Sequence, residues 1–146
     1  MSPKKDAMQT ESTVYTFLEV AAGLERRLDR TLSILGLSFR EYRLLKKLAT
    51  VGASGCARID LAEAVGLTPS AITRALKPLE KLGYATTIRN KRDARQSLGK
   101  ITSGGMVLFE DARNLIQETL MSLPVSSLGK HELIDFETKL QNMWSK

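Results

Sequence analysis

The chain has 146 residues, of which 42% are hydrophobic and 26% charged, and its net charge at neutral pH is +6. This hydrophobic content argues against a disordered chain, and no apolar run approaches the ~18 residues that a membrane helix needs. One cysteine and one histidine exclude an internal disulfide framework and a His- and Cys-rich metal site. We therefore expect one domain over residues 1–146 that needs no cofactor or metal and has no membrane partner.

Two helices are predicted in the first third of the chain. Apolar residues keep helical spacing from about residue 12 to residue 35, which predicts a long first helix. Ser38 is a suitable N-cap for a second helix that turns Phe39, Tyr42 and Leu48 inward. Residues 1–6 are not followed by an apolar stretch, so we expect no secretory signal and a cytoplasmic location.

The segment from Leu61 to Thr68 predicts a helix-turn-helix. Small Ala62 allows two helices to cross closely, and Gly66 tolerates the positive φ of a tight turn. Thr68 followed by proline is typical of an N-cap at the start of the next helix. Two departures stand out: the second helix contains Pro78, which should bend it, and Ala57 leaves the first helix without a hydroxyl cap.

The second helix of this motif separates apolar from polar residues. Its apolar side holds Ile72, Ala75, Leu76 and Leu79, and its outer side holds Ser70, Arg74, Lys77 and Lys81, with Thr73 at the edge. Hydroxyls and cations suit phosphates and base edges, although a solvated basic face would have the same composition.

A β-hairpin is predicted after the helix-turn-helix. Residues 84–89 are rich in β-formers, residues 90–96 are polar and turn-like, and residues 97–101 can return as a second strand, which Gly99 weakens. A helix-turn-helix followed by a hairpin is the order of a winged helix, here over residues 38–102. The wing tip carries Arg89, Lys91, Arg92 and Arg95.

Two more helices are predicted over residues 103–146. The first, capped by Thr102 or Ser103, runs to Pro124, and the second begins at about Ser127 or Gly129. Together with the first helix they carry long apolar stripes, which either fold back within one chain or pack against a second copy. The expected fold is mainly α with a small β-wing, flanked by N- and C-terminal helices.

The net charge is concentrated on the predicted recognition helix and wing. Residues 74–100 hold eight cations and two anions, a net of +6 that equals the net charge of the whole chain. A clustered excess of this kind is typical of a protein with a polyanionic partner.

These motifs resemble those of the multiple-antibiotic-resistance regulator (MarR) family of winged-helix transcription factors. The matching residues are Leu61-Ala62, Gly66-Leu67-Thr68, Ile72-Thr73-Arg74, Leu79-Glu80-Lys81-Leu82-Gly83, Arg89, Asp93-Ala94-Arg95, Ile101-Thr102 and Gly105. The resemblance implies a homodimer whose terminal helices, about 12–35 and 103–146, form the interface. The interface residues that we expect on this basis are Val14, Phe17, Leu18, Leu115, Leu133, Phe136 and Leu140.

On this reading the protein is a transcriptional repressor that binds a pseudo-palindromic operator in double-stranded DNA. The residues that we expect to bind DNA are Thr68, Ser70, Ala71, Thr73, Arg74, Lys77, Arg89, Lys91, Arg92 and Arg95. The recognition helix would enter the major groove, Arg95 would reach the minor groove, and Asp93 would orient the wing arginines. The resemblance further implies a small aromatic or phenolic effector, for which Arg26, Tyr42 and Arg43 are candidate pocket residues.

Two other functions fit parts of the sequence. A winged-helix protein-docking module would need an apolar or mixed recognition face, and a sequence-neutral nucleoid-associated protein would share the basic patch without an operator preference. No enzymatic activity is predicted, because His131 stands alone near a helix start and no residue pattern activates a nucleophile. Cys56 is expected to be a small buried hydrophobe rather than a redox sensor.

Overall fold

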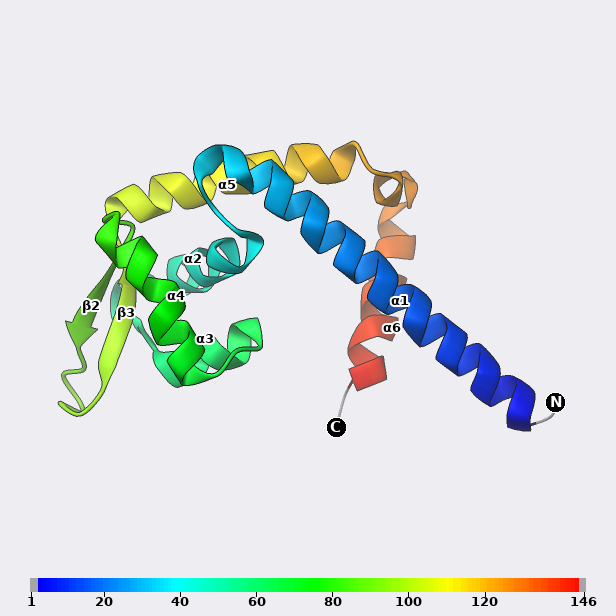
Figure 1. The fold of residues 1–146 in the computed structure, drawn as a ribbon, viewed down its shortest axis with the longest axis horizontal. Helices are drawn as coiled ribbons and strands as arrows, with labels where there is room; N and C mark the ends of the chain where they lie inside the picture. The colour runs from blue at the N-terminus through cyan, green and yellow to red at the C-terminus, as the bar shows by residue number, and fades with distance from the viewer. Residues whose placement is uncertain (1–2, 145–146) are drawn as a thin grey trace.

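Six α-helices and a three-stranded sheet make up the computed structural model, which describes residues 3–144 (Figure 1). Short 3-10 turns η1, η2 and η3 join several of them. The elements in chain order are α1 (Pro3–Leu32), η1 (Ser33–Leu35), α2 (Phe39–Val51), η2 (Gly52–Ser54), β1 (Cys56–Ala57), α3 (Arg58–Val65), α4 (Pro69–Lys81), β2 (Ala85–Arg89), β3 (Ser97–Ile101), α5 (Ser103–Met121), η3 (Pro124–Ser127) and α6 (Lys130–Trp144).

The core lies where α2, α3 and α4 meet the C-terminal end of α1 and the middle of α5. The large side chains that are fully buried are Leu32, Leu44, Leu45, Leu48, Leu61, Ile72, Leu76 and Leu79. From α5, Leu108, Phe109, Ala112 and Ile116 complete the cluster. Fully burying one such side chain contributes about 1.5–3 kcal/mol, so this cluster fixes the helix-turn-helix against α2 and α5.

Three hydroxyl caps place the starts of α2, α4 and α5. Ser38 Oγ accepts from the Glu41 backbone N–H at 3.1 Å while Glu41 Oε2 accepts from the Ser38 N–H at 2.9 Å, which is a capping box. Thr68 Oγ1 accepts from the Ala71 N–H at 3.2 Å, and Thr102 Oγ1 accepts from the Gly105 N–H at 3.0 Å. The predicted caps are confirmed, and Thr102 rather than Ser103 caps α5.

The helix-turn-helix follows the predicted course. Gly66 ends α3 at φ 68°, and the Leu67 N–H donates to the Ala62 carbonyl at 2.9 Å across the turn. Ala57 makes no side-chain cap bond. Pro78 lies inside α4, which nevertheless continues to Lys81.

The strands form an antiparallel sheet in the order β1-β3-β2. Arg89 pairs with Ser97 at the tip end of the hairpin, and Ala85 pairs with Ile101 at its base. Strand β3 continues through Gly99, where an added Cβ would lie 3.4 Å from Leu48 and 3.5 Å from Leu61. These are ordinary contact distances, so the central strand lies against the core leucines without needing a glycine for space.

The terminal helices differ most from the sequence expectation. Helix α1 begins at Pro3 rather than near residue 12 and ends at Leu32, and residues 33–35 form a 3-10 turn. Helix α5 ends at Met121, before the predicted Pro124. The early start of α1 escaped prediction because residues 3–11 are mainly polar and exposed, so they carry no apolar periodicity.

Candidate nucleic-acid interface

Helix α4 presents a polar, cationic face on the surface of the helix-turn-helix. Its side chains Ile72, Leu76 and Leu79 are buried, whereas Arg74 and Lys77 are exposed. Thr68, Ser70 and Lys81 are also exposed, and Ala71 and Thr73 are half-buried. The predicted outer face is therefore the solvent-accessible face of α4.

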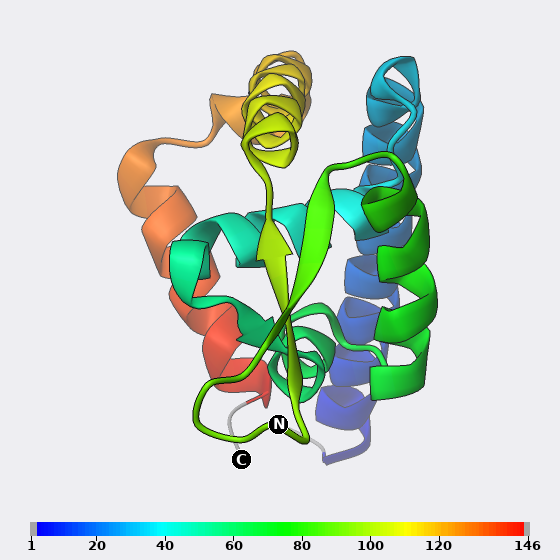
Figure 2. The same cartoon turned by 90° about the vertical axis from the view of Figure 1, so that its left-hand side faces the viewer.

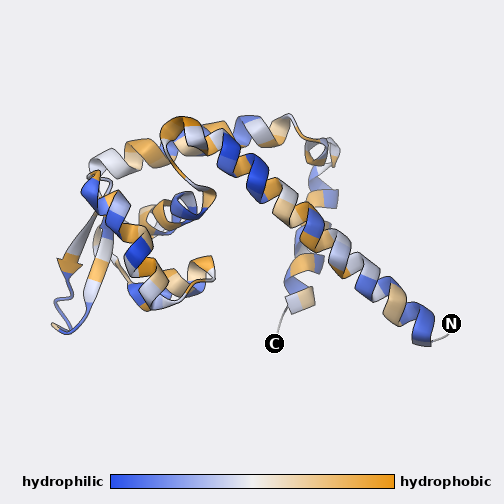
Figure 3. Ribbon diagram, viewed as in Figure 1, coloured by the Kyte–Doolittle hydropathy of each residue, from blue (hydrophilic) through white to orange (hydrophobic). Residues whose placement is uncertain are grey.

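The β2–β3 hairpin lies beside α4 at one end of the molecule (Figures 1 and 2). The first residues of α4 and the tip of the hairpin point toward the same edge, the lower one in Figure 1. Figure 3 shows that the tip is almost entirely hydrophilic. Arg89, Lys91, Arg92 and Arg95 are all exposed on the wing. The cationic tip and the start of α4 therefore lie on the same side of the molecule.

Polar side chains hold the backbone of the wing tip. The Asn90 N–H donates to the Gln96 carbonyl at 3.0 Å, and the Asn90 side-chain oxygen accepts from the Arg92 N–H at 3.0 Å. Asp93 Oδ1 accepts from the Arg95 backbone N–H, also at 3.0 Å. The described contacts of Asp93 include no guanidinium group, so its carboxylate acts on the backbone of Arg95 rather than on an arginine side chain.

Both anions of the basic segment are engaged in local hydrogen bonds. The Thr87 hydroxyl on β2 donates to Glu80 Oε1 on α4, and Asp93 holds the tip turn as described above. Arg89 and Arg95 line one hollow of about 410 Å³ on the wing. The exposed charge that remains available to a partner on this surface is therefore mainly positive, which favours a polyanion.

One residue of this surface was missed by the sequence analysis. Arg58, at the start of α3, donates from Nε to Thr73 Oγ1 at 3.0 Å and from Nη1 to Ser97 Oγ. The Thr73 hydroxyl also donates to the Pro69 carbonyl at 3.2 Å. Thr73 is thus already bonded within the protein, which weakens its assignment as a base-reading residue.

Residues 35–96, from η1 to the wing tip, match the model of the MarR family. The matched segment spans most of the winged helix. The fold of the chain is also that of solved regulators: a mutant MarR from E. coli complexed with operator DNA is 21% identical, with a TM-score of 0.79 over 99% of this chain and 100% of that one. MepR from S. aureus, in complex with DNA, is 22% identical, with a TM-score of 0.78 over 89% of this chain and 94% of that one.

CouR from Rhodococcus jostii, bound to p-coumaroyl-CoA, is 22% identical, with a TM-score of 0.81 over 92% of each chain. Comparison with curated protein sequences gives no significant match. At these identities the likeness to solved structures establishes the fold, and the family match covers the winged helix.

A hollow of about 480 Å³ opens between α1, α2 and α5. Its lining includes Tyr42, Arg43, Lys46 and Lys47, whereas Arg26 is not among its residues. The Arg43 guanidinium donates to the carbonyls of Ala64 and Val65 at 3.2 and 3.3 Å, at the C-terminal end of α3. Arg43 therefore ties α2 to the helix-turn-helix and also lines the hollow.

The terminal helices outside the winged helix leave apolar side chains exposed. None of the residues of α6 is buried, and Leu133 and Phe136 are 38% and 48% exposed. On α1, Phe17 and Leu18 are exposed, and Val14, Leu115 of α5 and Leu140 of α6 are half-buried. A hollow of about 320 Å³ between α1 and α6 is lined by Phe17, Val20, Phe136, Leu140 and Met143, among others.

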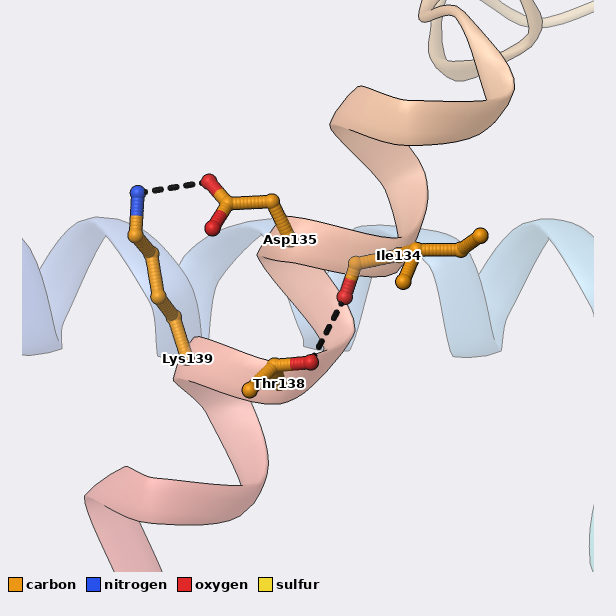
Figure 4. Close-up of polar contacts among 4 residues, drawn as sticks. All are labelled: Ile134, Asp135, Thr138 and Lys139. Carbon is orange, nitrogen blue, oxygen red and sulfur yellow. Dashed lines mark hydrogen bonds and ion pairs between the residues drawn. The ribbon is translucent and has the colours of Figure 1, made fainter.

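Two polar contacts within α6 are drawn in Figure 4. The Lys139 ammonium lies 2.7 Å from the Asp135 carboxylate, and the Thr138 hydroxyl donates to the Ile134 carbonyl at 2.9 Å. Such bonds support the helix without fixing it to the winged helix.

Cys56 and His131 lie apart from the cationic surface. The Cys56 side chain is 4% exposed in β1, and burial together with the nearby Asp60 raises the pKa of its thiol. Burial and a raised pKa keep the thiol protonated and unreactive. His131 is exposed on α6. Between residues 3 and 144, no three His, Cys, Asp or Glu side chains are grouped to hold a metal ion, and no helix is long and apolar enough to cross a membrane.

Proposed function

We propose that this protein is a transcriptional regulator that binds double-stranded DNA through α4 and the wing. The observation that carries the proposal is that α4 exposes the cations Arg74 and Lys77 and that the wing beside it exposes Arg89 and Arg95. The MarR and MepR complexes with DNA support it, because they share the fold. On this proposal Thr68, Ser70 and Ala71 place the start of α4 in the major groove.

Salt dependence of duplex binding tests the proposal. With about three phosphate contacts per subunit, a dimer should give a slope of roughly −5 for log affinity against log salt concentration. Fluorescence anisotropy of a labelled duplex measures this slope. A slope near zero would show that the basic surface does not bind the DNA backbone.

The second test separates base reading from backbone contact. Arg74→Ala should weaken binding to the best operator by about 1–3 kcal/mol and relax its sequence preference, because a base contact carries sequence information. Lys91→Ala should weaken all duplexes by a similar factor, because phosphates are the same in every sequence. If both variants weaken operator and random DNA in the same ratio, the two roles are wrongly assigned.

A repressor that acts on a pseudo-palindromic operator requires two copies of the winged helix. We infer that α1, α5 and α6 form the homodimer interface, since their exposed apolar side chains, among them Phe17, Leu18 and Phe136, would be covered by a second copy. The hollow between α1 and α6 offers a place for apolar side chains of that copy. The protein would then act in the cytoplasm, on the nucleoid.

The hollow between α1, α2 and α5 fits an anionic aromatic effector. Arg43, Lys46 and Lys47 supply cations beside Tyr42 and the apolar residues Leu28 and Ile116. The CouR complex with p-coumaroyl-CoA supports a ligand-responsive member of this fold. Salicylate, used as a probe, should release the operator in a titration, and Lys46→Ala with Lys47→Ala should weaken that response while leaving operator binding without the probe intact.

A sequence-neutral nucleoid-associated protein is the remaining candidate, since it would bind through the same surface. Genome-wide binding on the native chromosome distinguishes the two functions. Discrete peaks that share a pseudo-palindromic sequence indicate an operator, and uniform coverage indicates a nucleoid protein. A protein-docking module is disfavoured because the exposed face of α4 is built from hydroxyls and cations rather than apolar side chains.

A further inference from the structure

Arg58 connects the recognition helix to the wing. It is the first residue of α3 and is half-buried. Its Nε donates to Thr73 Oγ1 on α4 at 3.0 Å, and its Nη1 donates to Ser97 Oγ on β3. One planar guanidinium thus contacts both elements that form the candidate DNA surface, which lysine with its single ammonium nitrogen cannot do in the same geometry.

The position of Ser97 in the hairpin shows which part of the wing the Arg58–Ser97 bond holds. Ser97 pairs with Arg89 at the outer end of the β2–β3 ladder, where the wing tip begins. Closer to the core, β3 is held by pairing with β1 through Leu98 and Gly99. Beyond Ser97, the described side-chain hydrogen bonds of residues 90–96 remain within the tip. The Arg58–Ser97 bond is therefore where the outer wing is tied to the helices.

A second link holds the other strand of the wing. The Thr87 hydroxyl on β2 donates to Glu80 Oε1 in the last turn of α4. Each strand of the hairpin is thus bonded to the helix-turn-helix by one charge-assisted hydrogen bond, and such bonds are stronger than those between neutral groups. Two attachment points fix an orientation that one point would leave free to pivot.

We propose that Arg58 is a positioning residue that sets the angle between the recognition helix and the wing. Through this angle it fixes the distance between the groove contacts of α4 and those of Arg95 at the tip. Thr73 and Ser97 serve as its two acceptors rather than as DNA-reading groups. The functional part of this inference rests on the proposed DNA binding, whereas the attachment of the wing does not.

The alternative is that Arg58 simply binds a DNA phosphate through its positive charge. Substitutions that leave the net charge unchanged separate this role from the positioning role. Ser97→Ala removes one acceptor of Arg58 without altering any charge, and Ser97 is exposed, so this variant should fold. Arg58→Lys keeps the positive charge but loses the planar guanidinium that donates to Thr73 and Ser97 at the same time. Ser103→Ala is the matched control, because Ser103 is also exposed and the described residues show no side-chain hydrogen bond for it.

Amide hydrogen exchange tests the attachment without DNA. Ser97→Ala and Arg58→Lys should each speed exchange of the amides of β2 and β3 near Arg89 by about tenfold, as expected for loss of a bond to a charged group. Ser103→Ala should leave these amides unchanged. Unaltered exchange in both variants would overturn the proposal, whether or not the wild-type protein binds DNA.

Operator binding tests the consequence for recognition. Ser97→Ala should weaken the operator about tenfold, remove hydroxyl-radical protection where the wing lies and leave the major-groove protection of α4 in place. Adding Arg95→Ala to Ser97→Ala should then cost much less than Arg95→Ala costs in the wild type, because the wing contact is already lost. Additive effects of Ser97→Ala and Arg95→Ala would show that Arg58 acts through its charge alone. Operator binding as tight as that of the wild type, in both the Arg58→Lys variant and the Ser97→Ala variant, would show the same. Failure of the wild type to bind any duplex would instead refute the proposed function.

Discussion

Replacing Gly105 by alanine should destabilise the protein by about 3 kcal/mol, at the upper end of what overpacking costs. Both Gly105 and its neighbour Gly104 lie in the first turn of α5 with ordinary negative φ, so space and not backbone conformation distinguishes them. A Cβ on Gly105 would lie 1.9 Å from the Tyr84 carbonyl oxygen and 2.8 Å from Ile101 Cγ1. The first distance is more than 1 Å shorter than an ordinary carbon–oxygen contact of about 3.3 Å.

The carbonyl that would be displaced also takes part in the junction between wing and α5. The Tyr84 oxygen accepts from the Thr102 N–H at 3.1 Å, and the Thr102 hydroxyl donates to the Gly83 carbonyl at 2.6 Å. A shift of the Tyr84 carbonyl that relieves the clash therefore disturbs its hydrogen bond with the Thr102 N–H. At Gly104 an added Cβ would lie no closer than 3.8 Å to its neighbours, so Gly104→Ala should stabilise the helix by about 0.5 kcal/mol.

Urea unfolding of the two variants at one protein concentration measures this difference. The midpoint should fall for Gly105→Ala and rise slightly for Gly104→Ala at an unchanged slope, and the melting temperature of Gly105→Ala should drop by about 10 °C. Equal stability of the two variants would refute the reasoning, because it would mean that α5 does not lie against the Tyr84 carbonyl.

Three further predictions concern the terminal helices, the buried thiol and the wing. Replacing Leu133 and Phe136 together by glutamine should give monomers that keep their helical content but lose operator binding, and sedimentation equilibrium with circular dichroism checks both. Because burial raises the pKa of Cys56 above its ordinary value of 9.0, the folded state holds the thiol proton longer than the unfolded state. Stability should therefore fall as pH rises through about 9, and Cys56→Ala should flatten that fall, as measured by urea unfolding across the alkaline range. Asp93→Ala should weaken DNA binding at fixed salt although it removes a negative charge, since the carboxylate holds the Arg95 N–H; tighter binding would identify Asp93 as a repulsive surface charge.

Local signals in the sequence were sufficient to predict the winged helix. The caps at Ser38 and Thr68, the positive φ at Gly66 and the strands of the wing all lie where the sequence placed them, and Thr102 is the one of two predicted candidates that caps α5. Each depends on residues a few positions apart, whose hydrogen bonds and backbone preferences act before any tertiary packing. The outer face of α4 could also be predicted from local sequence, because helical periodicity assigns the polar face once the apolar face is known.

Contacts between distant segments were decided only by the tertiary structure. Arg58 reaches Thr73 and Ser97, which are 15 and 39 positions away in the chain, and no periodicity or motif links these residues. The sequence likewise placed Asp93 beside arginine side chains, whereas the fold of the tip turns its carboxylate to a backbone N–H. The length of α1 was underestimated because a polar, exposed helix leaves no apolar stripe to detect. The sequence shows which groups are able to form hydrogen bonds, but the packing of helices and strands determines which of these groups lie within hydrogen-bonding distance of one another.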